Sequence, residues 1–185
     1  MEIKLSGFGG QGIIRMGMIL GRAAAIFDNK NATLTQSFGP EARGGACSAQ
    51  LIVSEHEILY PYLTSPDVLV TMSQEAYDKF ESELKPGGIL FIEQDLVRAH
   101  PPEPGTKLYG ITATRIAEQM GNRMFANMVM LGFIVAITGI VSVEAIKKAV
   151  AGMVPDRSLA QNIQALEKGL AAGKEQLGQA SAPSV

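Results

Sequence analysis

The sequence predicts an α/β fold, namely a doubly wound three-layer sandwich around a mostly parallel sheet, in a single domain with a helical C-terminal part. Strand-like runs alternate with helix-like segments up to about residue 120, only helix-like segments follow, and no repeat or linker divides the 185 residues. Such alternation is typical of a parallel sheet with helices on both faces. We expect the domain to span residues 1–175, and residues 176–185, which are small and polar, to form a flexible tail.

Six short runs, each bounded by turn residues, are predicted as strands. They cover residues 2–6, 32–36, 46–53, 67–72, 88–93 and 107–111. The fourth run (DVLVTM) and the fifth (GILFIE) are largely apolar, which indicates buried strands. Glu57–Tyr60 is expected to extend the third strand as one arm of a hairpin. Tyr60 and Tyr62 beside Pro61 fit either the tip of that hairpin or a docking patch for a partner.

Six further segments carry apolar residues at helical spacing. They cover residues 13–27, 74–84, 113–120, 123–137, 142–152 and 156–173. Thr112, Ser142 and Asp156 stand where helix N-caps are expected. The run 124–141 is about as long and apolar as the shortest membrane helices. Asn127 and the glycines within that run favour a helix buried against the sheet instead, so no membrane span is predicted.

Composition excludes several classes of function. Hydrophobic residues make up 46% of the chain and charged residues 18%, with a net charge of −2, so no electrostatic footprint for nucleic acid or an anionic membrane is present. Cys47 is the single cysteine, and His56 and His100 lie far apart, so neither a disulfide nor a metal or iron–sulfur site is expected. The chain opens directly into a strand without a signal segment, which indicates a cytoplasmic location.

A glycine-rich loop, GFGGQG, follows the first predicted strand and precedes the first helix. Its candidate binding residues are Gly7, Gly9, Gly10, Gln11 and Gly12. Glycines allow a tight turn, and free amides at a helix start attract phosphate. A dinucleotide site also needs an acidic residue at the end of the second strand, where Thr35, Gln36 and Ser37 stand instead. A dinucleotide site, a turn that serves packing, and a site for another phosphate or a partner's cofactor therefore all stay open.

A second loop, SFGPEARGG, spans residues 37–45. Its candidate binding residues are Ser37, Gly39, Pro40, Glu41, Arg43, Gly44 and Gly45. Both loops follow the carboxyl ends of strands, so we expect them to share the edge of the sheet where open α/β folds bind ligands. Arg43 can hold a phosphate or carboxylate with two parallel hydrogen bonds, or it can pair with Glu41 and keep the loop rigid.

Together the two loops resemble the pair of motifs in the gamma subunit, or gamma domain, of 2-oxoacid:ferredoxin oxidoreductases. ANMVMLG at 126–132 and SLAQNIQALEKG at 158–169 are similar to later helices of that family, so the resemblance covers about residues 1–175. Asn127 and Asn162 in these helices are expected to form hydrogen bonds at helix interfaces. The chain looks most similar to the 2-oxoglutarate type, with the pyruvate, branched-chain 2-oxoacid and indolepyruvate enzymes as alternatives.

The resemblance implies a subunit of a complex that oxidatively decarboxylates a 2-oxoacid with coenzyme A, giving succinyl-CoA from 2-oxoglutarate, or that runs the reverse carboxylation. Thiamine diphosphate, Mg²⁺ and the iron–sulfur clusters are then held by partner subunits, called alpha, beta and a ferredoxin-like delta, and ferredoxin accepts the electrons. This chain is expected to bind no prosthetic group of its own and to have no independent activity.

Two roles for the loops follow from this resemblance. They either bind or gate coenzyme A, or serve as docking surface for the catalytic subunits. No residue is predicted to act as a catalytic acid, base or nucleophile. A stand-alone NAD(P)-dependent reductase, suggested by the first loop alone, is the remote alternative.

Overall fold

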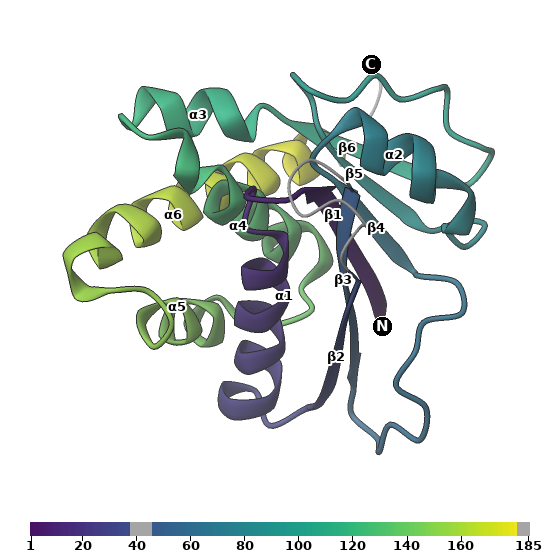
Figure 1. Cartoon of the computed structure of the whole chain (residues 1–185), viewed down its shortest axis with the longest axis horizontal. Helices are drawn as coiled ribbons and strands as arrows, with labels where there is room; N and C mark the ends of the chain where they lie inside the picture. The colour runs from purple at the N-terminus through teal and green to yellow at the C-terminus, as the bar shows by residue number, and fades with distance from the viewer. Residues whose placement is uncertain (38–45, 181–185) are drawn as a thin grey trace.

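The computed structural model describes residues 1–37 and 46–180, and its centre is a six-stranded sheet (Figure 1). The strand order is β2-β3-β1-β4-β5-β6. Strands β1, β4, β5 and β6 are parallel, whereas β3 is antiparallel to both of its neighbours, β1 and β2. The strands are β1 (Glu2–Phe8), β2 (Asn31–Ser37), β3 (Ala46–Ser54), β4 (Val68–Thr71), β5 (Ile89–Glu93) and β6 (Lys107–Ile111). The predicted α/β class with a mostly parallel sheet is confirmed.

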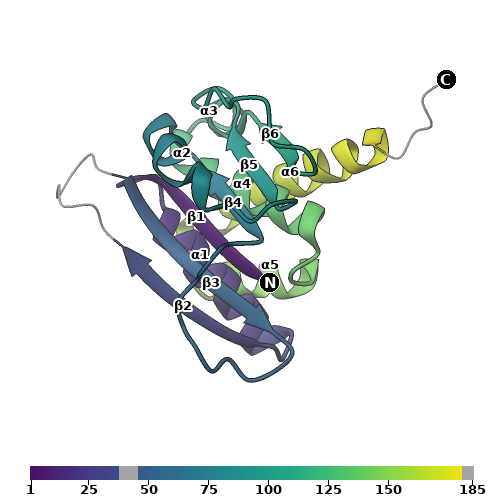
Figure 2. The same ribbon diagram turned by 90° about the vertical axis from the view of Figure 1, so that its right-hand side faces the viewer.

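Helices cover both faces of this sheet, but unequally. Figures 1 and 2 show α1, α4, α5 and α6 on one side and α2 on the other, so the molecule has three layers. A π-helical turn, Ala23–Phe27, follows α1, and short 3₁₀ turns, Glu81–Glu83 and Arg123–Phe125, follow α2 and precede α4. The helices are α1 (Ile13–Arg22), α2 (Gln74–Phe80), α3 (Ala113–Gln119), α4 (Ala126–Thr138), α5 (Val143–Ala151) and α6 (Asp156–Ala180).

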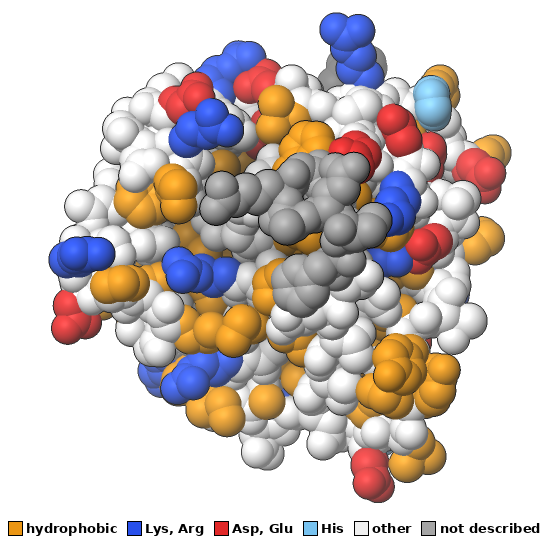
Figure 3. Space-filling view, viewed as in Figure 1, with side chains coloured by type: hydrophobic (Ala, Val, Ile, Leu, Met, Phe, Trp, Pro, Cys, Tyr) orange, Lys and Arg blue, Asp and Glu red, His pale blue; other side chains and the backbone are white. Residues whose placement is uncertain are grey.

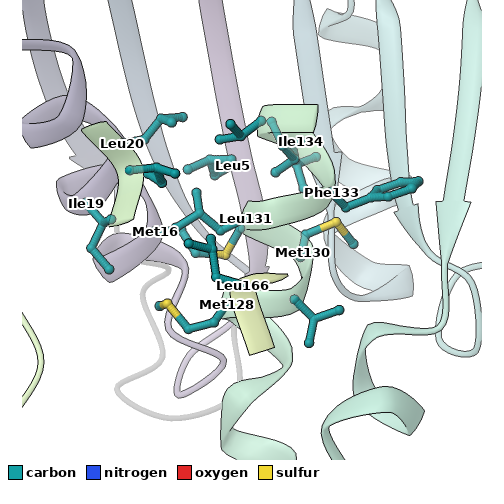
Figure 4. Packing of buried hydrophobic residues seen from close by; sticks show 14 of the residues in the cluster. Leu5, Met16, Ile19, Leu20, Met128, Met130, Leu131, Phe133, Ile134 and Leu166 are labelled. Carbon is teal, nitrogen blue, oxygen red and sulfur yellow. The ribbon is translucent and has the colours of Figure 1, made fainter. Parts of the chain in front are cut away.

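The main core lies between the sheet and the larger group of helices (Figure 4). Side chains alternate along each strand, so Ile3 and Leu5 of β1 face this core while Lys4 and Ser6 face α2. A fully buried side chain of this size stabilises the fold by about 1.5–3 kcal/mol. A smaller cluster, which includes Tyr77, packs α2 on the opposite face.

Helix α4 runs through the middle of the main core and crosses α6 at very short range. A Cβ atom added to Gly132 would lie 2.1 Å from the carbonyl oxygen of Leu166, and one added to Gly169 would lie 1.9 Å from that of Val129. The two backbones therefore touch where the glycines meet. The segment 124–141 is so apolar because most of α4 is buried in the main core. Among the described residues, no helix is long and apolar enough to cross a membrane.

Two predicted boundaries differ from the structure. Glu57–Tyr60 forms no strand, because β3 already pairs with β1 on one side and β2 on the other and offers no free edge. The segment is a loop with an exposed apolar tip, seen at the lower right of Figure 3, where the rings of Tyr60 and Tyr62 meet edge to face with 5.5 Å between centroids. Tyr60 and Tyr62 therefore do not form the tip of a hairpin.

The second difference concerns the C-terminal helix. Helix α6 continues past the predicted end at residue 173, so residues 176–180 are helical and not part of a tail. Gly173, the predicted last residue of the helix, lies against α4, where an added Cβ would stand 2.6 Å from the Cβ of Ala136. The side chain of Gln176 donates to the carbonyl oxygen of Gly110 at 2.8 Å and holds the last turns against β6. Residues 181–185 lie outside the described residues.

Candidate functional site

The glycine-rich loop lies at the carboxyl end of β1 and leads directly into α1. Gly10 and Gly12 have φ angles of +97° and +79°, a conformation that strongly favours glycine. The carboxamide oxygen of Gln11 accepts from the amide of Phe8 at 2.7 Å, and its nitrogen donates to the carbonyl of Met72 at 2.8 Å. Gln11 therefore ties the loop to the end of β4, and its side-chain amide has a structural partner on each side.

The start of α1 is open to an incoming anion. Gly12 is the N-cap residue and provides no side-chain cap, and no acidic residue stands in the first turn. The amides of a first helical turn lack intrahelical acceptors and carry the positive end of the helix dipole. A negatively charged ligand group at this position would satisfy them.

Two hollows flank the loop. The first has a volume of about 620 Å³, and its wall is mostly apolar. Its lining residues are Phe8, Gly9, Gly10, Gln11, Met72, Leu96, Thr114, Glu118, Arg123, Met124 and Ala126. We call it the apolar hollow. It lies beyond the carboxyl ends of β1 and β4, the part of an open α/β sheet where ligands bind.

The second hollow, of about 560 Å³, lies between the starts of α1 and α6. Its lining residues are Gly10, Gln11, Gly12, Arg15, Asn122, Met124, Phe125, Asn127, Pro155, Arg157, Ser158 and Asn162. We call it the cationic hollow, because its lining includes two arginines and no carboxylate. Gly10, Gln11 and Met124 line both hollows and form the ridge between them.

A buried carboxylate stands behind the apolar hollow. Glu93, at the end of β5, is fully buried and accepts from the amide of Thr114 at 2.9 Å, from its hydroxyl at 3.2 Å, and from the amide of Asp95 at 3.3 Å. Burial raises the pKa of Glu93 above its ordinary value, and the three hydrogen bonds act in the opposite direction. Because one carboxylate oxygen accepts from the first turn of α3 and the other from the amide of Asp95, Glu93 positions that helix and the turn after β5.

The structure brings the ends of the two predicted loops to one edge of the sheet. Phe8 pairs with Ala46 and Ser37 pairs with Ser48, so the end of β1, the end of β2 and the start of β3 are neighbours. Ser37 is exposed there. The other predicted residues of the second loop lie outside the described residues, and their role stays a prediction: Gly39, Pro40, Glu41, Arg43, Gly44 and Gly45.

Within the first loop, the predicted residues separate into two groups. Gly9, Gly10, Gln11 and Gly12 line the hollows. Gly7 lies within β1, where an added Cβ would stand 2.5 Å from the side-chain oxygen of Gln11, so it serves the packing of the loop.

Sequence reasoning missed the two arginines of the cationic hollow. Arg15 lies in the first turn of α1 and Arg157 in the first turn of α6, where a cation works against the helix dipole. This unfavourable placement of an arginine is a feature of the sequence that could have pointed to the site. Asn162 donates to the carbonyl of Ser158 at 2.8 Å, which is a bond within its own helix, whereas the side chain of Asn127 has no hydrogen-bond partner among residues 1–37 and 46–180.

Comparison with known proteins shows which sequences and structures this chain resembles. The family model described as "Pyruvate ferredoxin/flavodoxin oxidoreductase" matches residues 2–172. The 2-oxoglutarate synthase subunit KorC of Methanocaldococcus jannaschii is 48% identical over 176 residues, with 94% of each chain covered. The gamma subunit of a keto/oxoacid ferredoxin oxidoreductase from Geobacter sulfurreducens superposes with a TM-score of 0.83 at 40% identity, covering 93% of this chain and 97% of that one.

A larger solved structure contains the same fold as one part. The 2-oxoglutarate:ferredoxin oxidoreductase from Magnetococcus marinus, solved with 2-oxoglutarate, coenzyme A and succinyl-CoA bound, matches with a TM-score of 0.81 at 26% identity. The match covers 95% of this chain but 31% of that one. With the family model spanning nearly all of the sequence and a full-length relative at this identity, the chain belongs to the pyruvate ferredoxin/flavodoxin oxidoreductase family.

Proposed function

We propose that this chain is the gamma subunit of a 2-oxoglutarate:ferredoxin oxidoreductase complex. The observation that carries the proposal is the end-to-end similarity to a 2-oxoglutarate synthase subunit, which leaves no large part of either chain unmatched. The complex would convert 2-oxoglutarate and coenzyme A to succinyl-CoA and carbon dioxide and pass two electrons to ferredoxin, or run the reverse carboxylation. Within it this chain contributes to the coenzyme A site and to assembly.

The division of labour follows the family resemblance of the two glycine-rich loops. Partner subunits of alpha, beta and ferredoxin-like delta type hold thiamine diphosphate with Mg²⁺ and the iron–sulfur clusters, which supply the decarboxylation and electron-transfer chemistry. In residues 1–37 and 46–180 no group of three His, Cys, Asp or Glu side chains is placed to hold a metal ion. The chain's own part is binding: an uncapped helix start, a glycine turn and nearby arginines suit the phosphates of coenzyme A.

A purification through a tag on this chain tests the proposal. We expect alpha-, beta- and delta-type subunits to co-purify, and the assembly to reduce ferredoxin with 2-oxoglutarate and coenzyme A at a higher kcat/KM than with pyruvate, ketoisovalerate or indolepyruvate. An assembly that prefers another of these acids would correct the substrate. A chain that purifies alone and binds NADH or NADPH in a titration would support the stand-alone reductase and reject the complex.

Arg43→Ala separates the two roles considered for the second loop. If the loop binds coenzyme A, the variant complex should assemble normally and show a raised KM for coenzyme A, because a charge-assisted contact to phosphate is lost. If the loop only docks to partners, the yield of intact complex should fall while the activity of each complex stays unchanged.

A further inference from the structure

The two edges of the sheet differ in how they are protected. At one edge, β6 begins with Lys107, and Gln176 of α6 donates to the carbonyl of Gly110 at 2.8 Å. At the other edge, β2 pairs only with β3 (Figure 2), and its backbone forms no other hydrogen bond to the residues that the structure describes. Every second residue of an antiparallel edge strand points its amide and carbonyl outward, so β2 presents an open row of donors and acceptors.

Strand β2 also lacks the features that keep an edge from pairing. Its sequence, NATLTQS, contains no charged residue and no proline over seven residues. Natural proteins usually place such residues on an exposed edge or cover it, because an open row of backbone groups can pair with another chain. The occupant that satisfies these alternating donors and acceptors best is another extended strand.

Exposed apolar side chains flank this edge. A groove of about 260 Å³ lies between α1 and β2, and its wall includes the exposed Met18 and the partly buried Leu34. Ile26 is exposed in the π-helical turn that packs beside β2. On the side of the sheet away from α1, the loop after β3 carries the exposed rings of Tyr60 and Tyr62 (Figure 1). A specific interface buries at least about 1,000 Å², and these side chains add to the area of a paired edge.

The sequence of β2 is self-complementary about Leu34. In an antiparallel pair of two β2 strands centred on Leu34, Thr33 of one copy lies opposite Thr35 of the other, and the pairs on either side are likewise uncharged. No like charges face each other, and paired threonines are among the contacts that stabilise neighbouring strands. An identical strand therefore fits this edge, which favours a second copy of the chain as the occupant.

We propose that two copies of this chain pair antiparallel through β2 and join their two six-stranded sheets into one continuous sheet. The interface is isologous, because the same strand contributes from both copies. The proposal goes beyond the proposed function, since the pairing requires neither coenzyme A nor another subunit. In a complex that contains this chain, it links two assemblies through their gamma subunits.

The symmetry also brings the two α1 helices to the same face of the joined sheet. Identical antiparallel strands are related by a two-fold axis normal to the sheet. A Cβ atom added to Gly17 would lie 2.9 Å from Cδ1 of Leu34, so the middle of α1 stands beside that axis. Met18 of each copy then faces the other across the two grooves. Arg22, the only charged residue among the described ones that line the groove, lies one turn further along α1 and falls on opposite sides of the axis in the two copies.

The mass of the full chain in solution tests the pairing. Analytical ultracentrifugation of the chain on its own should show a species of twice the mass of one chain. Thr35→Lys places two lysines diagonally across the axis and should raise the Kd of this dimer about tenfold or more. Thr106→Lys, directly before β6 at the other edge, is the matched control and should leave the Kd unchanged. A wild-type chain that stays monomeric at every concentration overturns the proposal, as does a dimer that Thr35→Lys leaves intact.

Cysteine pairs test the register and do not depend on the lysine variant. Residues directly opposite each other in antiparallel strands have Cα atoms about 4.5–5.5 Å apart, within reach of a disulfide. The double variant Thr33→Cys/Thr35→Cys should therefore give covalent dimers when oxidised with glutathione disulfide. Thr35→Cys alone should give few, because its two copies lie diagonally, about 7–8 Å apart. A folded double variant that forms no covalent dimer overturns the register and the pairing with it.

Hydrogen exchange in the assembled complex distinguishes the two possible occupants of the edge. Pairing of copies predicts that the outward amides of β2 are protected both in the dimer of the isolated chain and in the complex, and that the double cysteine variant cross-links in both. If the isolated chain is monomeric and β2 becomes protected only in the complex, a strand of another subunit occupies the edge. That result rejects the pairing of copies and leaves the proposed function untouched.

Discussion

Helix α4 meets its neighbours through glycine in two places, with opposite results. In its middle, Gly132 and Gly169 let the backbones of α4 and α6 touch. In its first turn, Asn127 lies against Gly12 of the glycine-rich loop, and its amide atoms reach solvent and form no hydrogen bond to a described residue. The contact between α4 and α6 stabilises the fold, whereas the contact with Gly12 leaves the amide of Asn127 able to bind a ligand. Glycine therefore has two different roles where other parts of the chain pack against α4.

Filling the tight contact should produce the largest effect. Gly169→Ala would place a Cβ 1.9 Å from the carbonyl oxygen of Val129, which is backbone and cannot rotate away. Overpacking of this kind costs on the order of 3 kcal/mol or more. We expect chemical denaturation to show a loss of that size in the free energy of unfolding.

Gly178→Ala is the control in the same helix, since no described residue lies within 4 Å of an added Cβ there. Alanine should stabilise α6 at that position by up to about 1 kcal/mol. Equal stability of Gly169→Ala and the wild type would show that the helices can separate without cost and that the glycine contact is not what holds them.

Filling the looser contact should cost less. Gly12→Ala forces a left-handed φ on alanine, at about 1–2 kcal/mol, and displaces the amide of Asn127. Because the displaced atoms end a side chain and not a backbone, part of the clash can relax. The free energy of unfolding should fall by less than in Gly169→Ala, while the KM for coenzyme A rises. A loss as large as that of Gly169→Ala would mean that the site is packed as rigidly as the helix crossing.

Removing the unpaired amide should leave stability nearly unchanged. Asn127→Leu keeps the approximate volume and replaces a largely buried side chain whose amide atoms reach solvent and have no partner in the described residues. Such a change is expected to be neutral or to stabilise by up to about 1 kcal/mol, whereas breaking a satisfied hydrogen bond would cost about that much. Thermal unfolding measures the stability and coenzyme A kinetics measure the function. A destabilised variant with normal coenzyme A kinetics would identify Asn127 as an ordinary structural residue.

The sequence predicted most of the strands and helices, but it did not predict which of them pack beside one another. Alternation predicted the strands and helices because local apolar spacing reflects burial. The predicted hairpin arm at 57–60 was wrong because strand pairing depends on the tertiary structure. Strands β2 and β1 occupy the two edges of β3, and the residues near position 57 give no sign of this. The C-terminal helix was predicted to end at residue 173, but it continues to Ala180, and Gly173 lies within it because the contact with α4 requires a small residue there.

The site divides in the same way. The glycine pattern located the loop because it specifies backbone geometry locally. Both ends of the Gln11 carboxamide brace the loop, and its role as a binding residue stays a prediction. Arg15 and Arg157 come together because α6 begins beside α1, and that proximity of distant segments has no local signature. Each arginine stands in a first helical turn, where a positive charge is unfavourable. Residues that break a local rule in this way are expected at functional sites.

Glu93 sharpens the comparison further, because it is a buried polar group beside the loop that is fully paired. Burial raises its pKa above the ordinary 4.5, so the folded state holds the proton more tightly than the unfolded chain. Its contribution to stability is fully present below pH 4.5 and is lost as the pH rises through the folded pKa. Glu93→Gln removes this titration, so the free energy of unfolding of the variant, relative to wild type, should rise with pH above 4.5.

Glu144→Gln provides a control of opposite sign. Lys148 lowers the pKa of the exposed Glu144, so the ionised form stabilises the fold and the relative stability of that variant should fall slightly with rising pH. Denaturation curves measured across this pH range separate the two residues. A flat or falling difference for Glu93→Gln would mean that the donors of Thr114 and Asp95 outweigh the cost of burial. The folded protein would then favour the ionised form of Glu93. Glu93 could no longer be contrasted with Asn127 as a group whose role is purely structural.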